Sequence, residues 1–169
     1  MKSRKSAILV LLVLAASTIT WAASNHKATG DADWTNPYSG QANTTFNAIN
    51  THSTGLDAKG SLIYTDANVT YTMDVQFLQV VGNTAWFVGQ VTSVTPGDGF
   101  NGCCKVGNWV LYKVADNGEP GVNADQIWGE DLTQGENVTS SVAAFAKVND
   151  KADPQGGPFT INDSNIQVH

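Results

Sequence analysis

The sequence predicts an all-β fold, either an antiparallel β-sandwich or a small β-barrel, with one short helix near residues 141–148. Short segments rich in Val, Ile, Thr, Tyr, Phe and Trp recur along the chain, and Gly, Asn, Asp, Ser and Thr separate them at short intervals. Apolar and polar residues alternate within the best of these segments, which is typical of a strand with one buried face. This pattern favours antiparallel pairing but does not separate the sandwich from the barrel.

The clearest predicted element is a hairpin built on residues 70–81. Four apolar residues of this strand are expected to share one face: Tyr71, Met73, Val75 and Phe77. The alternation slips at residues 78–81, where we expect a bulge or a change of burial. Gly82 and Asn83 then form a two-residue hairpin turn. Residues 85–94 return as a strand that is apolar on both faces, which indicates a central, covered position.

The remaining elements are predicted from shorter patterns. Residues 95–102 are rich in turn formers and form a loop. Residues 108–116 form another strand, with Val110, Tyr112 and Val114 on one face, and Asn117–Gly118 is a turn signal. Weaker strands are expected at residues 44–50, 60–65, 125–129 and 160–168. Residues 141–148 suit a short helix, although strand-like alternation is also readable there.

The first residues of the chain have the pattern of a secretory signal peptide. Lys2, Arg4 and Lys5 precede an apolar run at residues 7–16, and small residues follow. The run is shorter than the roughly 20 residues that a membrane-spanning helix needs. We therefore expect a signal peptide at 1–22, with cleavage after Ala23 as the alternative. A flexible leader at 23–29 and a single β-domain at 30–169 follow, and the protein is expected to be secreted.

The charge of the chain excludes some classes of partner. The sequence holds 9 Lys and Arg against 15 Asp and Glu, and three of the basic residues lie in the predicted signal. Without it the net charge is 6 − 15 = −9, and no arginine remains. Nucleic-acid binding, which needs clustered Lys and Arg, is disfavoured, and so is an anionic membrane surface. A second long apolar run is absent from the sequence, so no membrane insertion is expected after signal cleavage.

Cys103 and Cys104 are adjacent, and they are the two cysteines of the chain. In an oxidising compartment thiols usually pair, but adjacent Cα atoms lie closer together than the usual disulfide span. Three states remain open: two thiols without a special role, a vicinal disulfide that stiffens the loop, and a bridge to another chain. A metal site is disfavoured, because further ligands at a recognised spacing are missing.

The densest group of oxygen ligands is formed by Asp116, Asn117, Glu119 and Asp125. Such oxygens around a tight turn could hold Ca²⁺, which takes six to eight oxygen ligands. The spacing does not match the helix-flanked Ca²⁺ loop. We therefore expect a polar turn in the first place, in which Asn-Gly supplies the backbone geometry. No other cofactor is expected.

Aromatic residues offer the best candidates for ligand binding. Trp34 and Tyr38 lie in a polar, proline-containing stretch, so they are expected to be the most exposed of the aromatic side chains. Exposed aromatic rings on a β-sheet could form a platform for a glycan. Catalytic motifs such as Gly-x-Ser-x-Gly and His-Glu-x-x-His are absent from the sequence, so no catalytic residue is assigned.

Three segments resemble a family of small secreted bacterial β-domains, the post-COAP-1-like domains. They are the hairpin sequence Phe77-Leu78-Gln79-Val80-Val81-Gly82-Asn83-Thr84-Ala85-Trp86, the turn Val114-Ala115-Asp116-Asn117-Gly118-Glu119, and the ending Asn165-Ile166-Gln167-Val168-His169. The ending departs from the family pattern, since Ser164 stands in place of a glycine. The resemblance implies a secreted bacterial β-domain, and it transfers no catalytic or binding residue.

Taken together, the residues lead to three hypotheses. The first is a non-enzymatic domain that binds an extracellular ligand, such as a glycan, or a surface component. The second is a structural subunit that self-assembles into a matrix or fibre, in which residues 23–35 add a strand to another copy. The third is a secreted hydrolase of unrecognised type, which would need facing carboxylates or a base and a nucleophile in one pocket.

Overall fold

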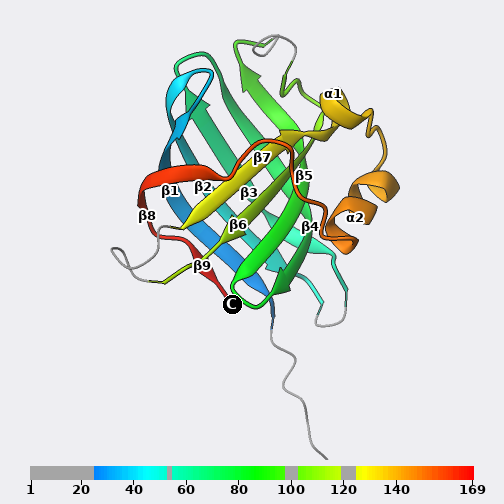
Figure 1. Cartoon of the computed structure of the whole chain (residues 1–169). Coiled ribbons are helices and arrows are strands. Elements are labelled where there is room, and N and C mark those ends of the chain that lie inside the picture. Colours follow the sequence, from blue (N-terminus) through cyan, green and yellow to red (C-terminus); the bar gives the residue numbers. More distant parts are fainter. Residues whose placement is uncertain (1–24, 53–54, 98–102, 119–124) are drawn as a thin grey trace, which may run out of the picture.

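The computed structural model describes residues 25–52, 55–97, 103–118 and 125–169, and it confirms the all-β prediction (Figure 1). The predicted signal peptide lies outside these residues. Strands dominate the described part, and their bounds are β1 (Lys27–Asn36), β2 (Gly40–Asn50), β3 (Ala58–Asp66), β4 (Thr70–Val81), β5 (Thr84–Thr95), β6 (Trp109–Ala115), β7 (Gln126–Asp131), β8 (Phe159–Ser164) and β9 (Gln167–Val168). The helices of this part are α1 (Leu132–Glu136) and α2 (Ser141–Asn149), and neither is long and apolar enough to cross a bilayer.

The strands form one curled antiparallel sheet that closes on itself through β1. Each strand from β1 to β7 pairs with the next along the chain, and β8 pairs back with β1. β1 is thus paired on both edges, with residues 40–49 of β2 on one side and with β8 and β9 on the other. The shortest pairings are β7–β8 and β1–β9, each with two residue pairs between its strands. This continuous pairing corresponds to the barrel of the two predicted alternatives.

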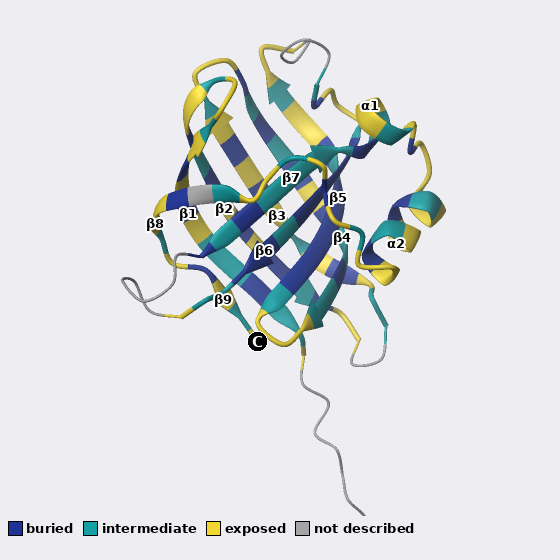
Figure 2. Cartoon of the chain, in the orientation of Figure 1, coloured by how far each residue is buried: buried dark blue, intermediate teal, exposed yellow. Residues whose placement is uncertain are grey.

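The main core fills the inside of the curled sheet (Figure 2). Side chains alternate between the two faces of a strand, so every second residue points inward. Phe87 of β5 stacks on Phe46 of β2 across the interior, with 5.2 Å between ring centroids, and on Tyr112 of the neighbouring β6, at 5.7 Å. Phe87, Leu62 and Met73 have no exposed surface. Their burial is the hydrophobic contribution that stabilises the barrel.

A second, smaller core lies outside the barrel, between the sheet and the two helices (Figures 1 and 2). Four outward residues of β5 and β6 are buried: Trp86, Val88, Trp109 and Leu111. Leu132 of α1 and Val148 of α2 pack against them. The prediction that these strands are apolar on both faces is confirmed, and so is the predicted helix at 141–148. Its first turn is capped by Ser140, whose Oγ accepts a hydrogen bond from the Ala143 N–H.

The bulges of the first hairpin lie earlier in β4 than the sequence predicts. The register of β4 against β5 shifts between Thr72 and Met73 and again between Val75 and Phe77, and residues 78–81 pair regularly. The extra residue reverses the alternation, so Phe77 faces outward and packs edge-on against Phe145 of α2 at 5.3 Å. The expectation that Phe77 shares the inner face with Tyr71 is therefore wrong, because a bulge changes which residues face the core.

Three further elements differ from the sequence prediction. β1 begins at Lys27, so residues 27–29 belong to the sheet although a flexible leader was expected at 23–29. The predicted strand at 160–168 is divided into β8 and β9, which both pair with β1, and between them the Asn165 N–H still donates to the Asp31 carbonyl at 3.0 Å. The short helix α1 was not predicted, because a five-residue helix has no readable period. The Gly82–Asn83 turn is confirmed, with Gly82 at a φ of 62°.

Gly89 of β5 offers a test of how tightly the sheet packs. A methyl group at this position would lie 2.1 Å from the carbonyl oxygen of Asp74 on β4. We expect Gly89→Ala to lower the free energy of unfolding by about 1–3 kcal/mol, as overpacked sites do. Thermal unfolding followed by circular dichroism measures the change. Gly97→Ala is the matched control, because its methyl group would meet no atom within 4 Å. Equal melting temperatures for the two variants would contradict the β4–β5 packing.

Candidate ligand-binding cavity at one end of the barrel

A cavity of about 600 Å³ opens at one end of the barrel. This end is formed by the β1–β2 turn, the β3–β4 turn, the β5–β6 loop and the start of α1, and it lies at the top of Figure 1. Its volume is in the range of pockets that hold small molecules. The residues that line it come from six strands, β1, β3, β4, β6, β7 and β8, and from the connections and the helix at this end.

Aromatic rings form much of the cavity wall. They belong to residues that are far apart in the sequence: Trp34, Tyr64, Tyr71, Tyr112 and Phe159. Trp34 stacks on Phe159 with 4.4 Å between ring centroids, and Tyr64 stacks on Tyr71 at 5.0 Å. Each of the five is an inward position of its strand, so the alternation that builds the core also builds this wall.

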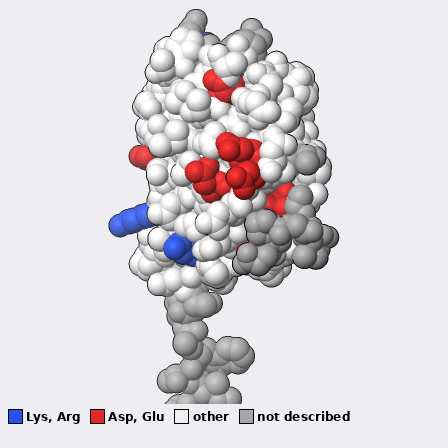
Figure 3. Space-filling model, turned by 90° about the vertical axis from the view of Figure 1, so that its left-hand side faces the viewer, with Lys and Arg blue, Asp and Glu red and all other residues white. Residues whose placement is uncertain are grey.

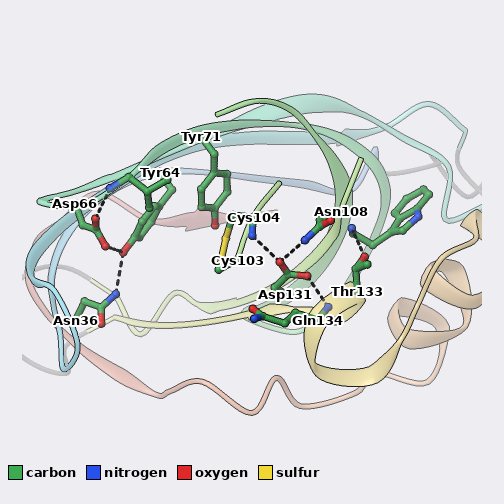
Figure 4. Close-up of a disulfide and its surroundings, with 12 residues drawn as sticks. Asn36, Tyr64, Asp66, Tyr71, Cys103, Cys104, Asn108, Asp131, Thr133 and Gln134 are labelled. Atoms are coloured by element: carbon green, nitrogen blue, oxygen red, sulfur yellow. Dashed lines mark hydrogen bonds between the residues drawn. A yellow bond between two sulfur atoms is a disulfide. The ribbon is translucent and has the colours of Figure 1, made fainter. Parts of the chain in front are cut away.

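The hydroxyl groups of Tyr64, Tyr71 and Tyr112 form hydrogen bonds within the protein. The Tyr71 and Tyr112 oxygens lie 2.5 Å apart, deep in the barrel. Tyr64 donates to Asp66 Oδ2 at 2.6 Å and accepts from Asn36 Nδ2 at 2.8 Å (Figure 4). Burial raises the pKa of all three tyrosines above the ordinary value of 10.0. They are therefore neutral at physiological pH, and they offer a ligand mainly their ring faces.

Asp66 holds the β3–β4 turn at the cavity rim. Its Oδ1 accepts hydrogen bonds from the backbone N–H groups of Asn68 and Val69, at 2.7 and 2.9 Å. Partial burial acts to raise the pKa of this carboxyl. The hydrogen bonds it accepts, from the Tyr64 hydroxyl and these two N–H groups, outweigh that effect and keep the pKa below the ordinary value of 3.8. Asp66 is therefore a carboxylate at neutral pH.

A vicinal disulfide in the connection between β5 and β6 forms another part of the cavity wall. Cys103 and Cys104 are bonded to each other, which is one of the three states that the sequence left open. Asp131 fixes this loop, because its Oδ2 accepts from the Cys104 N–H at 2.6 Å and from Asn108 Nδ2 at 2.7 Å. Asp131 Oδ1 also caps α1 by accepting from the Gln134 N–H at 3.0 Å (Figure 4). One carboxylate thus ties the loop, β7 and the helix together.

The charged residues that line the cavity are all acidic. They are Asp66, Glu130 and Asp131, and no Lys, Arg or His is among the described residues of the lining. Glu130 differs from the two aspartates in its orientation, because it pairs with outward Leu111 while the neighbouring Gly129 faces the Tyr112 ring, so its side chain lies on the outer face of the sheet. There its Oε2 accepts from the Gln155 N–H at 2.9 Å, and its Oε1 is buried and has no hydrogen-bond partner among the described residues. The negative charge inside the cavity therefore comes from Asp66 and Asp131.

The structure places both of the sequence-predicted binding residues at this cavity. Tyr38 is 87% exposed at the mouth, as expected. Trp34 was expected to be exposed and is only 4% exposed, so that expectation is wrong. It lies on an inward position of β1 and donates from Nε1 to Thr44 Oγ1 at 3.0 Å. The expectation failed because β1 was not predicted as a strand.

Sequence reasoning missed the other residues of the wall. Tyr64, Tyr71 and Tyr112 had been placed on strands, but nothing in the sequence indicated that these strands meet around one space. A signal was present in the alternation, since all three fall on the apolar face of their strands. Phe159 and Asp66 stand at strand ends, where pattern alone does not distinguish a lining residue from a turn residue.

The predicted oxygen cluster lies at the other end of the barrel, and Glu119 is outside the described residues. Asp116 Oδ1 accepts from the Gly118 N–H at 3.0 Å, and its Oδ2 accepts from the Val168 N–H at 3.2 Å. Asp125 is buried, and it accepts from the Asn117 N–H at 2.9 Å and from Ser164 Oγ at 2.7 Å. These carboxylates hold the β6–β7 connection against the C-terminal strands.

Acidic side chains also gather on the outside of the barrel, on the side that Figure 3 faces. Asp31 and Asp33 are exposed on β1, and Asp163 of β8 is the register partner of Asp33. Asn43 Nδ2 lies between the first two and donates to both, at 2.7 and 2.9 Å. This face carries the negative charge that the composition predicts, and it is separate from the cavity lining.

Comparison with known proteins finds no matching family model, no matching curated protein and no matching solved structure. The candidate site therefore rests on the geometry of this chain.

Asp66 gives the cavity rim a pH-dependent stability that can be measured. Because its pKa is lower in the folded protein than in the unfolded chain, its contribution is present above about pH 4 and is lost as the pH falls through the folded pKa. We expect Asp66→Asn to lower the melting temperature at pH 7. The difference from the wild type should shrink as the pH is lowered toward 2.5. A difference that stays constant over this range would contradict the assignment.

Proposed function

We propose that this chain is a secreted, non-enzymatic β-domain that binds a small extracellular ligand in the cavity at the end of its barrel. The observation that carries the proposal is the aromatic wall around a space of about 600 Å³ that opens to the surface. Exposed Tyr38 stands at its mouth, and buried rings line its interior. An apolar pocket with a few polar groups is the usual form of a small-molecule site.

The cavity is also built to keep its shape. Asp66 and Asp131 each accept at least three hydrogen bonds, and these fix the turn, loop and helix that frame the opening. The covalent Cys103–Cys104 link limits the freedom of the loop on the opposite side. A site whose walls are fixed before binding loses less conformational entropy when the ligand enters. This rigidity supports a binding role.

The alternative functions have less support from the described residues. Strand addition would use residues 23–35, but Lys27–Asn36 is paired on both edges within its own sheet. A hydrolase would need carboxylates that are free to exchange protons or attack a substrate. Asp66 and Asp131 are instead engaged in holding backbone N–H groups. Both alternatives remain hypotheses of lower rank than ligand binding.

Binding can be tested with Nile red, a neutral dye whose fluorescence rises in apolar surroundings. We expect the purified protein to bind the dye saturably with one site per chain. Gln134 is exposed on α1 and lines the mouth of the cavity, so Gln134→Trp should weaken binding about tenfold by occupying that space. Fluorescence titration measures both affinities.

Gln41→Trp is the matched control, because Gln41 is exposed on β2 and is not part of the cavity lining. This variant should bind the dye as the wild type does, and both variants should keep the wild-type circular dichroism spectrum. Saturable binding that Gln134→Trp leaves unchanged would place the dye elsewhere. The absence of saturable binding would refute the proposed function.

A further inference from the structure

We infer that the ligand of this cavity is a neutral, largely apolar molecule that presents a carbonyl oxygen to the hydroxyl pair of Tyr71 and Tyr112. The inference rests on the proposed function and adds the chemical class of the ligand. Three features of the described lining lead to it: one surplus hydrogen-bond donor in the hydroxyl pair, the lack of a cationic side chain, and the internal use of the other aromatic polar groups.

The hydroxyl pair lies deep in the cavity and is almost fully buried. Tyr71 of β4 and Tyr112 of β6 both belong to the cavity lining, and they are only 4% and 2% exposed. Figure 4 shows the Tyr71 side chain directed into the interior, beside the disulfide. Tyr71 stacks on Tyr64 with 5.0 Å between ring centroids. Tyr112 stacks on Phe87 at 5.7 Å, so both rings are held in place before a ligand enters.

The pair carries one hydrogen-bond donor more than it uses. The two oxygens lie 2.5 Å apart, and either hydroxyl can be the donor of the bond between them. Burial raises the pKa of both groups, so each keeps its one hydrogen at neutral pH. The hydroxyl that accepts the shared bond therefore has a hydrogen left over, and neither hydroxyl forms a second hydrogen bond among the described residues. A buried donor without an acceptor is unfavourable, and an oxygen of a bound ligand would satisfy it.

A carbonyl group is the acceptor that matches this surplus donor best. It offers lone pairs and brings no hydrogen that must find an acceptor of its own. The hydrogen of an alcohol would find an acceptor at the pair only by closing a ring of three hydrogen bonds. Such a ring bends each bond away from the nearly linear geometry that hydrogen bonds prefer. The hydroxyl pair therefore favours a carbonyl compound over an alcohol.

The charges of the lining exclude an anionic acceptor. No Lys, Arg or His is among the described residues of the lining, and the charged side chains inside the cavity are the carboxylates Asp66 and Asp131. A carboxylate ligand would lose its hydration here without gaining a counter-charge. A neutral ketone or ester avoids this loss. The acceptor that faces the hydroxyl pair is therefore uncharged.

The rest of the aromatic wall favours an apolar body. Trp34 Nε1 donates to Thr44 Oγ1 at 3.0 Å, and the Tyr64 hydroxyl is held between Asn36 and Asp66. These polar atoms are used within the protein, so the two residues offer a ligand mainly the surfaces of their rings. A polyol such as a sugar would bring many hydroxyls to a wall that has few partners for them. A molecule with one carbonyl group and an apolar body fits both the wall and the hydroxyl pair.

Four probes of matched shape test the inference by displacing Nile red. The ketone is 4-phenylbutan-2-one, and in the hydrocarbon 2-methyl-4-phenylbut-1-ene a methylene group replaces its oxygen. The alcohol is 4-phenylbutan-2-ol, and the carboxylate is 3-phenylpropanoate. We expect the ketone to bind more tightly than the alcohol, and the carboxylate to bind most weakly. Nile red is first titrated against each protein, because the dye also carries a carbonyl group.

The double variant Tyr71→Phe/Tyr112→Phe removes both hydroxyls and keeps both rings. We expect the affinity of the ketone relative to the hydrocarbon to fall about tenfold, which is the effect of losing one hydrogen bond from a buried donor. Comparing the two probes in the same proteins cancels the difference in their hydration. Removing both partners leaves no hydroxyl unpaired, so the variant should fold, and circular dichroism checks this.

The matched control removes a hydroxyl pair outside the cavity. Thr70 Oγ1 donates to Thr65 Oγ1 at 3.2 Å across β3 and β4, in an exposed position, and neither residue belongs to the cavity lining. The double variant Thr65→Val/Thr70→Val should keep the wild-type affinity of the ketone relative to the hydrocarbon.

An infrared measurement tests the contact in the wild type itself. The ketone is labelled with ¹³C at its carbonyl carbon, and its stretching band moves to lower frequency when the oxygen accepts a hydrogen bond. We expect the band of the bound ketone to lie below its position in hexane. In the tyrosine double variant the band should return toward the hexane position. A band at the hexane position in the wild type would contradict the inference.

The outcomes separate the two claims. If Nile red binds saturably but the tyrosine double variant keeps the wild-type ratio, the carbonyl inference is wrong and the binding function stands. The same holds if the alcohol or the carboxylate binds more tightly than the ketone. If the double variant does not fold, the infrared band of the wild type decides. If neither Nile red nor the ketone finds a saturable site, the proposed function fails.

Discussion

The pairing of β1 on both of its edges is the constraint on which the rest of this structure depends. β1 joins β2 along ten residue pairs and joins β8 and β9 on the other side. This contact brings together segments more than 120 residues apart, such as Ala32 and Ser164. Without it the sheet would have two open edges, and open edges invite pairing with other chains. Closure therefore encloses the interior of the barrel, and it also removes the two open edges at which another chain could pair.

The closed sheet sorts side chains by strand face, and this sorting explains both cores. Inward positions of β3, β4 and β6 supply the tyrosines that continue the core up to the cavity. Outward positions of β5 and β6 are covered by the helices, which close one side of the barrel against water. The bulge in β4 belongs to the same arrangement, since it turns Phe77 outward to meet Phe145. The cavity is thus the unfilled end of a core whose other parts are closely packed.

Local features of this fold could be predicted from the sequence. The hairpin around Gly82–Asn83 and the helix at 141–148 depend on neighbouring residues, and both are confirmed. Features that depend on distant contacts could not be predicted. β1 has small and polar residues in place of the usual β-branched ones, because Ala28, Gly30 and Ala32 face a crowded interior. Its strand character comes from its partners.

The candidate site was predictable only in part for the same reason. Trp34 and Tyr38 were singled out from local composition, and the ring to which they belong needed the closed sheet. The disulfide was one of three states for Cys103 and Cys104, and sequence alone offered no reason to place it beside Tyr71.

The most direct measurement of the central claim is a map of backbone amide shifts in ¹⁵N-labelled protein as 4-phenylbutan-2-one is added. The account predicts that shifts concentrate at the cavity end, at Asn36, Tyr71 and Cys104 among others. Asp116 and Val168, at the opposite end, should keep their positions. Shifts that concentrate at the opposite end or on the acidic outer face would contradict the claim that this cavity is the binding site.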